Sequence, residues 1–262
     1  MNPEFAAQVA ALARQLSSNQ VAAWGAVLAT APGPLPDIQA KLIDRTSGME
    51  ASTSARQLVE VWQRQAPHLS GEAVALALTA ASAAHEQAEH DRARLVVSGP
   101  STAAVPVRLT SSVVVGLVRA ATRKLLVVSF AAYGVADVVR ELTSAAARGV
   151  RLDLVLETST AMGGGLRGTG AADAFAALRD VATFWHWPTS HRPVRASLHA
   201  KVVVADAEVA LLGSANLTDR ALSDNIEVGV LSRDRGFANR LDRHFRALMR
   251  PETRCLSPLE VS

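Results

Sequence analysis

The stretch His199-Ala200-Lys201-Val202-Val203-Val204-Ala205-Asp206 decides how the second half of this chain folds and which chemistry it can perform. Its three consecutive valines predict a buried strand. Residues two apart on a strand leave the same face, so we expect the side chains of His199 and Lys201 to point together. Lysine is rare here, since only three of the 27 basic residues are lysines, so composition does not explain a lysine beside a histidine.

A turn and a charged strand follow this stretch. Gly213-Ser214-Ala215-Asn216 is a turn whose serine and asparagine can donate hydrogen bonds to an anion. Both residues could instead only cap the next helix, and the asparagine could do both. Glu227 lies among isoleucine and valine on a predicted strand. An inward-facing carboxylate is costly there unless it has a partner, so we expect Glu227 to act beside His199.

These residue types suit the cleavage of a phosphodiester. A neutral imidazole is a good nucleophile near pH 7, so we assign this role to His199. Lys201, Ser214 and Asn216 can donate to charged phosphoryl oxygens. Glu227 can accept from the other ring nitrogen of His199 and fix its tautomer. Lysine and the imidazolium supply the electrostatic stabilisation, so we predict no metal and no cofactor.

Asp206 lies at an odd offset from His199, at the turn where the strand ends. It cannot share the face of the histidine unless the strand ends before it. We include Asp206 in the catalytic set through an indirect role, in which it anchors the turn or a neighbouring base.

The H-x-K-x4-D pattern, with the Gly-Ser-Ala-Asn turn and the later glutamate, resembles the signature of the phospholipase D superfamily. The resemblance is specific across 197–231 and extends over about 95–250 in the order of elements. It implies a mixed β-sheet flanked by helices. It also implies a histidine that forms a covalent phosphohistidine, and a second histidine that protonates the leaving oxygen. Such enzymes include lipid hydrolases, bacterial endonucleases and phosphodiesterases, so the motif indicates the chemistry better than the substrate.

One histidine motif is half of such a site. His186 lies in Phe184-Trp185-His186-Trp187, which is typical of a packed aromatic cluster, and His191 lies in a loop from which it could reach the substrate. The simplest completion is a symmetric homodimer that places two copies of His199 in one cleft, because twofold contacts are the commonest in oligomers.

A second, narrower resemblance rests on the layout of the chain. A helical N-terminal block, then Ser98-Gly99-Pro100 and residues 105–110, and one motif near residue 200 look like the phospholipase D-like subunit of DISARM-type antiphage systems. This resemblance implies partner subunits, namely a helicase and a DNA methyltransferase. It also places Arg108 and Thr110 near the mouth of the cleft, where Arg108 would bind substrate, although a structural role fits both residues equally.

Composition describes a core-forming chain and excludes a disordered one, with 49% hydrophobic and 19% charged residues. The net charge of +3 permits an anionic partner without establishing one, and the arginines that supply it suit phosphate groups but are also compatible with a functionless surface. The single cysteine, Cys255, allows no intrachain disulfide. We see no secretory signal and no apolar run long enough to span a membrane, so we expect a cytoplasmic protein.

We predict two domains, a helical domain at 1–93 and an α/β domain at 94–262. In the first, turn and cap signals separate helices at 21–30, 37–45, 53–65 and 71–92. In the second, a strand at 124–130, a helix at 135–148 and a strand at 150–157 make a βαβ unit with parallel strands. We predict further strands at 95–98, 196–205, 208–213 and 226–231, helices at 171–180, 215–222 and 235–249, and a loop at 158–170.

Three functions compete. The favoured one is a metal-independent phosphodiesterase that acts on nucleic acid. The second is a phospholipase or phosphatidyl transferase, against which stand the single motif and the lack of an amphipathic membrane helix. The third is a catalytically silent scaffold that binds DNA or protein partners. The glycines Gly163–Gly165 do not indicate a phosphate-binding loop, since no Lys-Ser/Thr follows them.

Overall fold

The computed structural model describes residues 2–46, 49–100, 104–105, 107–133, 135–158 and 172–260. The chain divides into two compact units, Met1–His90 and Asp91–Ser262. The predicted domain boundary after residue 93 falls between the last helix of the first unit and the first strand of the second. The predicted loop at 158–170, which contains Gly163–Gly165, lies outside the described residues beyond Thr158. No helix in the described ranges is long and apolar enough to cross a membrane.

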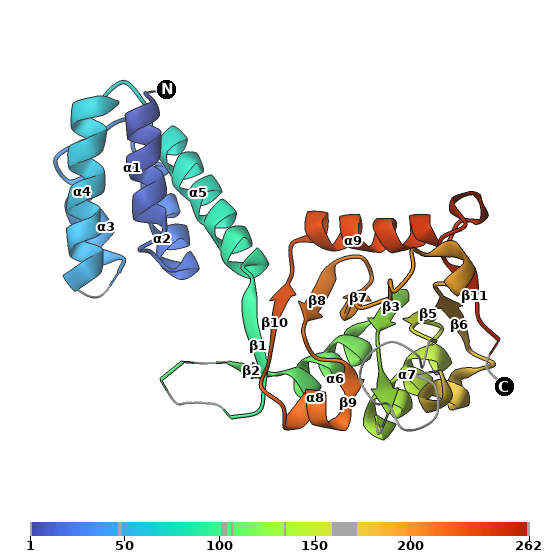
Figure 1. The fold of residues 1–262 in the computed structure, drawn as a ribbon. Coiled ribbons are helices and arrows are strands. Elements are labelled where there is room, and N and C mark those ends of the chain that lie inside the picture. Colours follow the sequence, from blue (N-terminus) through green and yellow to red (C-terminus); the bar gives the residue numbers. More distant parts are fainter. Residues whose placement is uncertain are drawn as a thin grey trace. The chain divides into compact units, whose positions relative to one another are not determined.

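The first unit is all helical, as predicted (Figure 1). Two fully buried tryptophans form the centre of its core, and each finds a partner for its indole N–H. Trp24 Nε1 donates to Thr46 Oγ1 at 3.3 Å, and Trp62 Nε1 donates to the carbonyl of Leu69 at 3.1 Å. The helices are α1 (Pro3–Ala13), α2 (Ser18–Leu28), α3 (Ile38–Asp44), α4 (Met49–Gln65) and α5 (Gly71–Asp91). Both tryptophans are therefore packing residues.

The second unit is built on a nine-stranded mixed sheet with the order β11-β6-β5-β3-β7-β8-β10-β1-β2. Its strands are β1 (Arg94–Ser98), β2 (Arg108–Leu109), β3 (Lys124–Ser129), β5 (Arg151–Leu156), β6 (Ala182–His186), β7 (Val202–Ala205), β8 (Val209–Gly213), β10 (Glu227–Ser232) and β11 (Ser257–Pro258). A separate pair joins β4 (Ala132–Tyr133) to β9 (Leu217–Thr218). The parallel pairing of β3 with β5 confirms the predicted βαβ unit.

Helices cover both faces of this sheet (Figure 1). One face packs on α6 (Thr110–Ala120) and α7 (Ala136–Ala147), and α8 (Asp219–Ser223) lies on the same side. The other face packs on α9 (Arg235–Leu248). Successive residues of β3 alternate between the two cores, so Val127 faces α6 and α7 while Leu126 and Val128 face α9. The expected mixed α/β architecture is confirmed.

Several predicted elements have different bounds. The strand expected at 196–205 exists only over Val202–Ala205, and the helix expected at 171–180 is a 3-10 segment at Asp173–Leu178. The helix expected at 215–222 begins only at Asp219, after the short strand β9. The sequence analysis assigned no element to α6, whose interior carries three consecutive valines. Their placement against the sheet outweighs the low helix propensity of β-branched residues.

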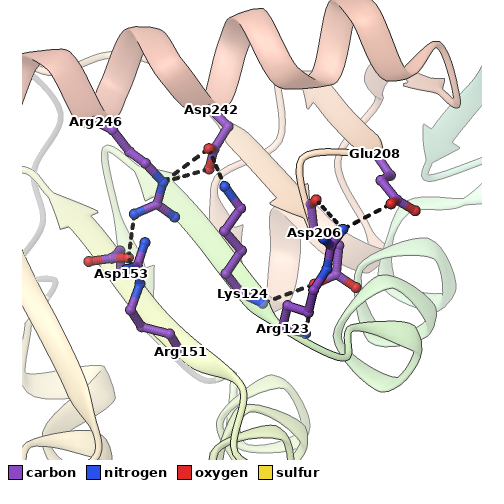
Figure 2. A network of polar contacts seen from close by, with 8 residues as sticks. All are labelled: Arg123, Lys124, Arg151, Asp153, Asp206, Glu208, Asp242 and Arg246. Carbon is purple, nitrogen blue, oxygen red and sulfur yellow. Dashed lines mark hydrogen bonds and ion pairs between the residues drawn. The ribbon is translucent and has the colours of Figure 1, made fainter.

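Buried charges hold α9 on the sheet (Figure 2). Lys124 Nζ at the start of β3 lies 2.6 Å from Asp242 Oδ2. Arg246 donates through Nε to Asp242 at 2.9 Å and through Nη1 to Asp153 on β5 at 2.9 Å. The side chain of Asp242 is 3% exposed, so its charge depends on these two cations.

Asp206 anchors the end of β7 to the start of β3 (Figure 2). Its carboxylate accepts the backbone amides of Thr122, Arg123 and Lys124 at 2.8–2.9 Å and the hydroxyl of Thr122 at 3.0 Å. Burial alone would raise the pKa of Asp206, but these hydrogen bonds, with that of Lys124 foremost, hold the pKa below its ordinary value. Of the two indirect roles considered for Asp206, the structure supports the anchor.

Asp242→Asn is expected to lower the free energy of unfolding by about 3–5 kcal/mol, because it leaves two cations beside a neutral amide in a buried position. Urea unfolding at neutral pH measures this change. Asp137→Asn is the matched control, since the ion pair of Asp137 with Arg140 is exposed on both sides and is worth less than about 1 kcal/mol. Equal losses in both variants would show that the network contributes nothing beyond a surface pair.

Asp206→Asn is expected to destabilise the protein by about 1–3 kcal/mol at pH 7, because it weakens charge-assisted hydrogen bonds to three amides. A carboxylate with a depressed pKa contributes stability above its unfolded pKa, and this contribution disappears as pH falls through the folded pKa. The difference between wild type and variant should therefore be full at pH 7 and should shrink below about pH 4. Urea unfolding across pH 7 to 3 tests this, and a constant difference would contradict the anchoring role.

Candidate active site

The directions of the strands gather the candidate residues at one edge of the sheet. β3 and β5 are parallel, β7 is antiparallel to β3, β8 to β7, and β10 to β8. The carboxyl ends of β3, β5 and β8 therefore lie at the same edge as the amino ends of β7 and β10. We call this the active edge. It carries Ser129 at the end of β3 and Phe130 after it, Glu157 after β5, His199 and Lys201 before β7, Ser214 and Asn216 after β8, and Glu227 at the start of β10.

His199 and Lys201 lie side by side at the active edge. Lys201 Nζ is 3.0 Å from Nδ1 and 3.3 Å from Nε2 of His199, and it donates to the carbonyl of His199 at 2.8 Å. The two residues precede β7, so they are not neighbours on a strand face as predicted. The lysine instead turns back over the non-strand backbone before β7. An ammonium group has no lone pair, so it donates to an unprotonated ring nitrogen.

Phe130 supports both groups from the end of β3. Its ring centroid lies 4.9 Å from that of His199, with the planes tilted by 50°, and Lys201 Nζ lies 5.5 Å from the same centroid. The ring restricts the imidazole and attracts the ammonium through its π face. Nothing in the sequence marks Phe130 except its position directly after a buried strand.

Burial lowers the pKa of Lys201, and the negative charge of Glu227 opposes this shift without cancelling it. The ammonium is thus partly stripped of water while the nearby carboxylate helps to keep it charged. A partly dehydrated cation at an open edge gains more from an incoming anion than a fully hydrated one does. This favours the predicted role of Lys201 as a ligand for phosphoryl oxygens.

Glu227 is held by the turn that follows β8. Its carboxylate accepts a short hydrogen bond from Ser214 Oγ and another from Asn225 Nδ2 at 3.3 Å. The expected hydrogen bond to His199 is therefore not formed here, because the ring nitrogens lie against Lys201 instead. Glu227 is joined to the site through its charge and through Ser214.

Asn216 lies close to the end of β3, since the next amide, that of Leu217, donates to Ser129 Oγ at 3.2 Å. Its buried Oδ1 finds no hydrogen-bond partner within the described part of the chain. Thr218 caps α8 by accepting from the amide of Ala221 at 3.2 Å, so the alternative that Asn216 caps this helix is wrong. Buried polar atoms without partners are uncommon and concentrate at functional sites.

Asp206 lies at the opposite edge of the sheet. It follows β7 and binds the start of β3, so it takes no direct part at His199. Arg108 lines a cavity of about 280 Å³ together with Asp206, Glu208 and Arg233, and its role in substrate binding stays a prediction. Thr110, by contrast, is buried, and its hydroxyl accepts from Ser98 Oγ at 2.7 Å at the carboxyl ends of β1 and β2.

In the described part of the chain, neither His186 nor His191 shares a hydrogen bond or ring contact with His199. His186 ends β6, which is separated from β7 by β5 and β3, and its Nδ1 lies 3.4 Å from Thr158 Oγ1. Burial lowers the pKa of His186. His191 has an exposed side chain in a 3-10 turn, and its carbonyl accepts from Trp187 Nε1 at 3.2 Å. Among the described residues no group of three or more His, Cys, Asp or Glu side chains could hold a metal ion.

The structure adds a buried ion pair that the sequence analysis did not single out. Glu157 and Arg192 meet at 2.8 Å with side chains 2% and 5% exposed, and Glu157 also accepts the amide of Leu198, the residue before His199, at 2.7 Å. A carboxylate directly after a buried strand is a signal that could have pointed to Glu157.

Comparison with known proteins identifies the family. The family model described as "Cardiolipin synthase, PLD-like domain" matches residues 114–249, just over half of the chain. Cardiolipin synthase A of Pseudomonas putida strain F1 is 47% identical over 45 residues, which are 17% of this chain and 9% of that protein. Cardiolipin synthase A of Pseudomonas entomophila strain L48 is 46% identical over 46 residues, or 18% and 10% of the two chains. The chain thus matches about a tenth of the length of these relatives.

Solved structures with a similar fold include Nuc, a phospholipase D family member from Salmonella typhimurium, at 20% identity, a TM-score of 0.43 and coverage of 60% of this chain and 92% of that one. Phosphatidylserine synthase from Haemophilus influenzae Rd KW20 is 12% identical, with a TM-score of 0.46 and coverage of 71% and 48%. The family model spans α6 to α9 and so contains the His199–Lys201 pair, Asn216 and Glu227. The chain belongs to the phospholipase D-like family.

Proposed function

We propose that this chain is a phospholipase D-type phosphodiesterase in which His199 is the nucleophile. One observation carries the proposal, namely the contact of Lys201 Nζ with the exposed imidazole of His199 at an edge that also carries Ser214, Asn216 and Glu227. A nucleophile with a cation beside it meets the two needs of phosphoryl transfer, which are attack on phosphorus and compensation of charge on its oxygens. Membership of the family supports the same chemistry.

The proposed reaction has two steps. A ring nitrogen of His199 forms a bond to phosphorus, the bond from phosphorus to the leaving oxygen breaks, and a general acid gives that oxygen a proton. Water then gives up a proton to the same group and attacks phosphorus, and the nitrogen–phosphorus bond breaks. Lys201 and Asn216 would hold the non-bridging oxygens. The phosphoryl oxygen would draw Lys201 away from the ring and free the nitrogen that the ammonium now occupies.

The general acid requires a second histidine, and we propose that a symmetric homodimer supplies it as the second copy of His199. Exposed apolar side chains support this proposal, since Ile226, Val228 and Val230 are 81%, 55% and 42% exposed on and just before β10, the strand that begins with Glu227. Such a group of residues offers a second copy an apolar surface on the strand that carries Glu227. His191 is the alternative within one chain.

We propose nucleic acid as the substrate, because His199 is exposed at an open edge and arginine, which suits phosphate groups, supplies nearly all of the positive charge. The layout further supports a place in bacterial antiphage defence, beside a helicase and a DNA methyltransferase. A lipid substrate is the second candidate, favoured by the relatives named cardiolipin synthase A.

His199→Ala is expected to lower turnover by about 10³-fold or more, because it removes the atom that forms the covalent adduct. Wild type and variant are incubated in excess EDTA with labelled DNA, RNA, phosphatidylcholine and phosphatidylglycerol. His244→Ala, an exposed histidine on α9, is the matched control and should retain activity. Cleavage of nucleic acid by wild type alone supports the proposal, lipid turnover favours the second candidate, and DNA binding without turnover favours a silent scaffold.

Val228→Lys is expected to convert a dimer to a monomer and to reduce turnover at least tenfold, while the urea midpoint stays close to wild type because the side chain is exposed. Light scattering reports the mass. Co-expression of differently tagged wild-type and His199→Ala chains adds a second test, since purified mixed dimers should have well under half of the wild-type activity. A fully active monomer would contradict the shared cleft.

A further inference from the structure

We infer that Glu157 is a positioning residue, which holds the backbone next to His199 through a carboxylate clamp. This inference rests on the proposed function, because it assigns Glu157 a part in the same site. The clamp is defined here as Glu157, Arg192 and the backbone amide of Leu198. Arg192 donates to both carboxylate oxygens of Glu157 at 3.1 and 2.8 Å, and the amide of Leu198 donates to Oε2 at 2.7 Å.

The clamp acts where strand pairing ends. The ladder between β3 and β7 runs from Leu125 opposite Ala205 to Val128 opposite Val202, so residues 198–201 lie beyond it. The backbone of Glu157 continues the ladder of β5 through a bond from its amide to the carbonyl of Ser129 at 3.3 Å. Its side chain then reaches Leu198, 41 residues along the chain. A rigid strand end thereby fixes the peptide next to His199.

The residue types in the clamp indicate that it positions the backbone next to His199 rather than only stabilising the fold. A buried ion pair loses much hydration, and its replacement by apolar residues of similar volume is often neutral or stabilising. Stability alone therefore does not require Glu157 and Arg192. The amide of Leu198, however, is buried and needs an acceptor, and an ionised carboxylate binds it more strongly than a neutral group. We therefore assign the clamp the role of fixing the orientation of His199.

The test separates position from stability through a double variant, Glu157→Leu/Arg192→Leu. We expect its urea midpoint to fall only modestly, as for one buried amide left without an acceptor, while exchange of the Leu198 amide, followed by NMR, becomes about tenfold to hundredfold faster. On bis(p-nitrophenyl) phosphate we expect kcat to fall about tenfold to hundredfold with KM changed less than threefold, because misplacement affects the attack more than binding. The amide of Val204, inside β7, is the internal reference and should not change.

The matched control is Arg119→Leu/Glu141→Leu, which removes an arginine–glutamate pair between α6 and α7 and should leave both exchange at Leu198 and kcat unchanged. Wild-type exchange at Leu198 or wild-type kcat in the clamp variant would overturn the inference. If the double variant does not fold, Glu157→Gln decides, since it keeps an oxygen for Leu198. It should lower kcat about twofold to tenfold at constant KM, and a raised KM with unchanged kcat would refute positioning. If wild type cleaves no substrate, the proposed function fails, and exchange at Leu198 alone decides whether the clamp exists.

Discussion

The position of the candidate nucleophile depends on how the backbone on either side of β7 is held, because β7 has only four residues. Beyond its far end, the carboxylate of Asp206 accepts the amides of residues 122–124. Before its near end, the carboxylate of Glu157 accepts the amide of Leu198. Both acceptors bind backbone donors outside the ladder between β3 and β7. These hydrogen bonds to side chains therefore fix the backbone on both sides of β7, which is too short to position His199 through strand pairing alone.

The two lysines of the α/β unit show how the same residue type serves structure at one edge and chemistry at the other. Lys124 has a carboxylate oxygen of Asp242 at 2.6 Å, so its charge is compensated within the fold. Lys201 has an imidazole at 3.0 Å and a phenyl ring at 5.5 Å, and Glu227 acts on it only through its charge. Burial lowers the pKa of Lys201, and among the described residues no direct ion pair offsets its loss of water. The cation at the active edge is therefore the one that can accept an anionic ligand.

Much of the architecture could be predicted because the hydrophobic pattern and the turn residues agree. Strand β3 is a continuous apolar run, β5 is apolar inside except for Asp153, and the intervening helix ends at a glycine, so the parallel unit was predictable. Helix α6 was not, since its valines are typical of strands and only the contact with the sheet favours a helix. The strand predicted at 196–205 is six residues too long at its start, since only Val202–Ala205 pair in the sheet. Among its first six residues, the amide of Leu198 donates to Glu157 and the carbonyl of His199 accepts from Lys201, and such side-chain contacts leave no periodic signal in the sequence.

The sequence by itself determined which chemistry is available, because the imidazole, the ammonium and the amide of His199, Lys201 and Asn216 are properties of residue types and their spacing. Only the tertiary structure decided which groups meet. It placed Asp206 at the opposite edge of the sheet and brought Phe130, Glu157 and Arg192 to the active edge. The physical reason is that strand direction and order, which arise from packing across the whole sheet, set distances between residues that are tens of positions apart in the chain.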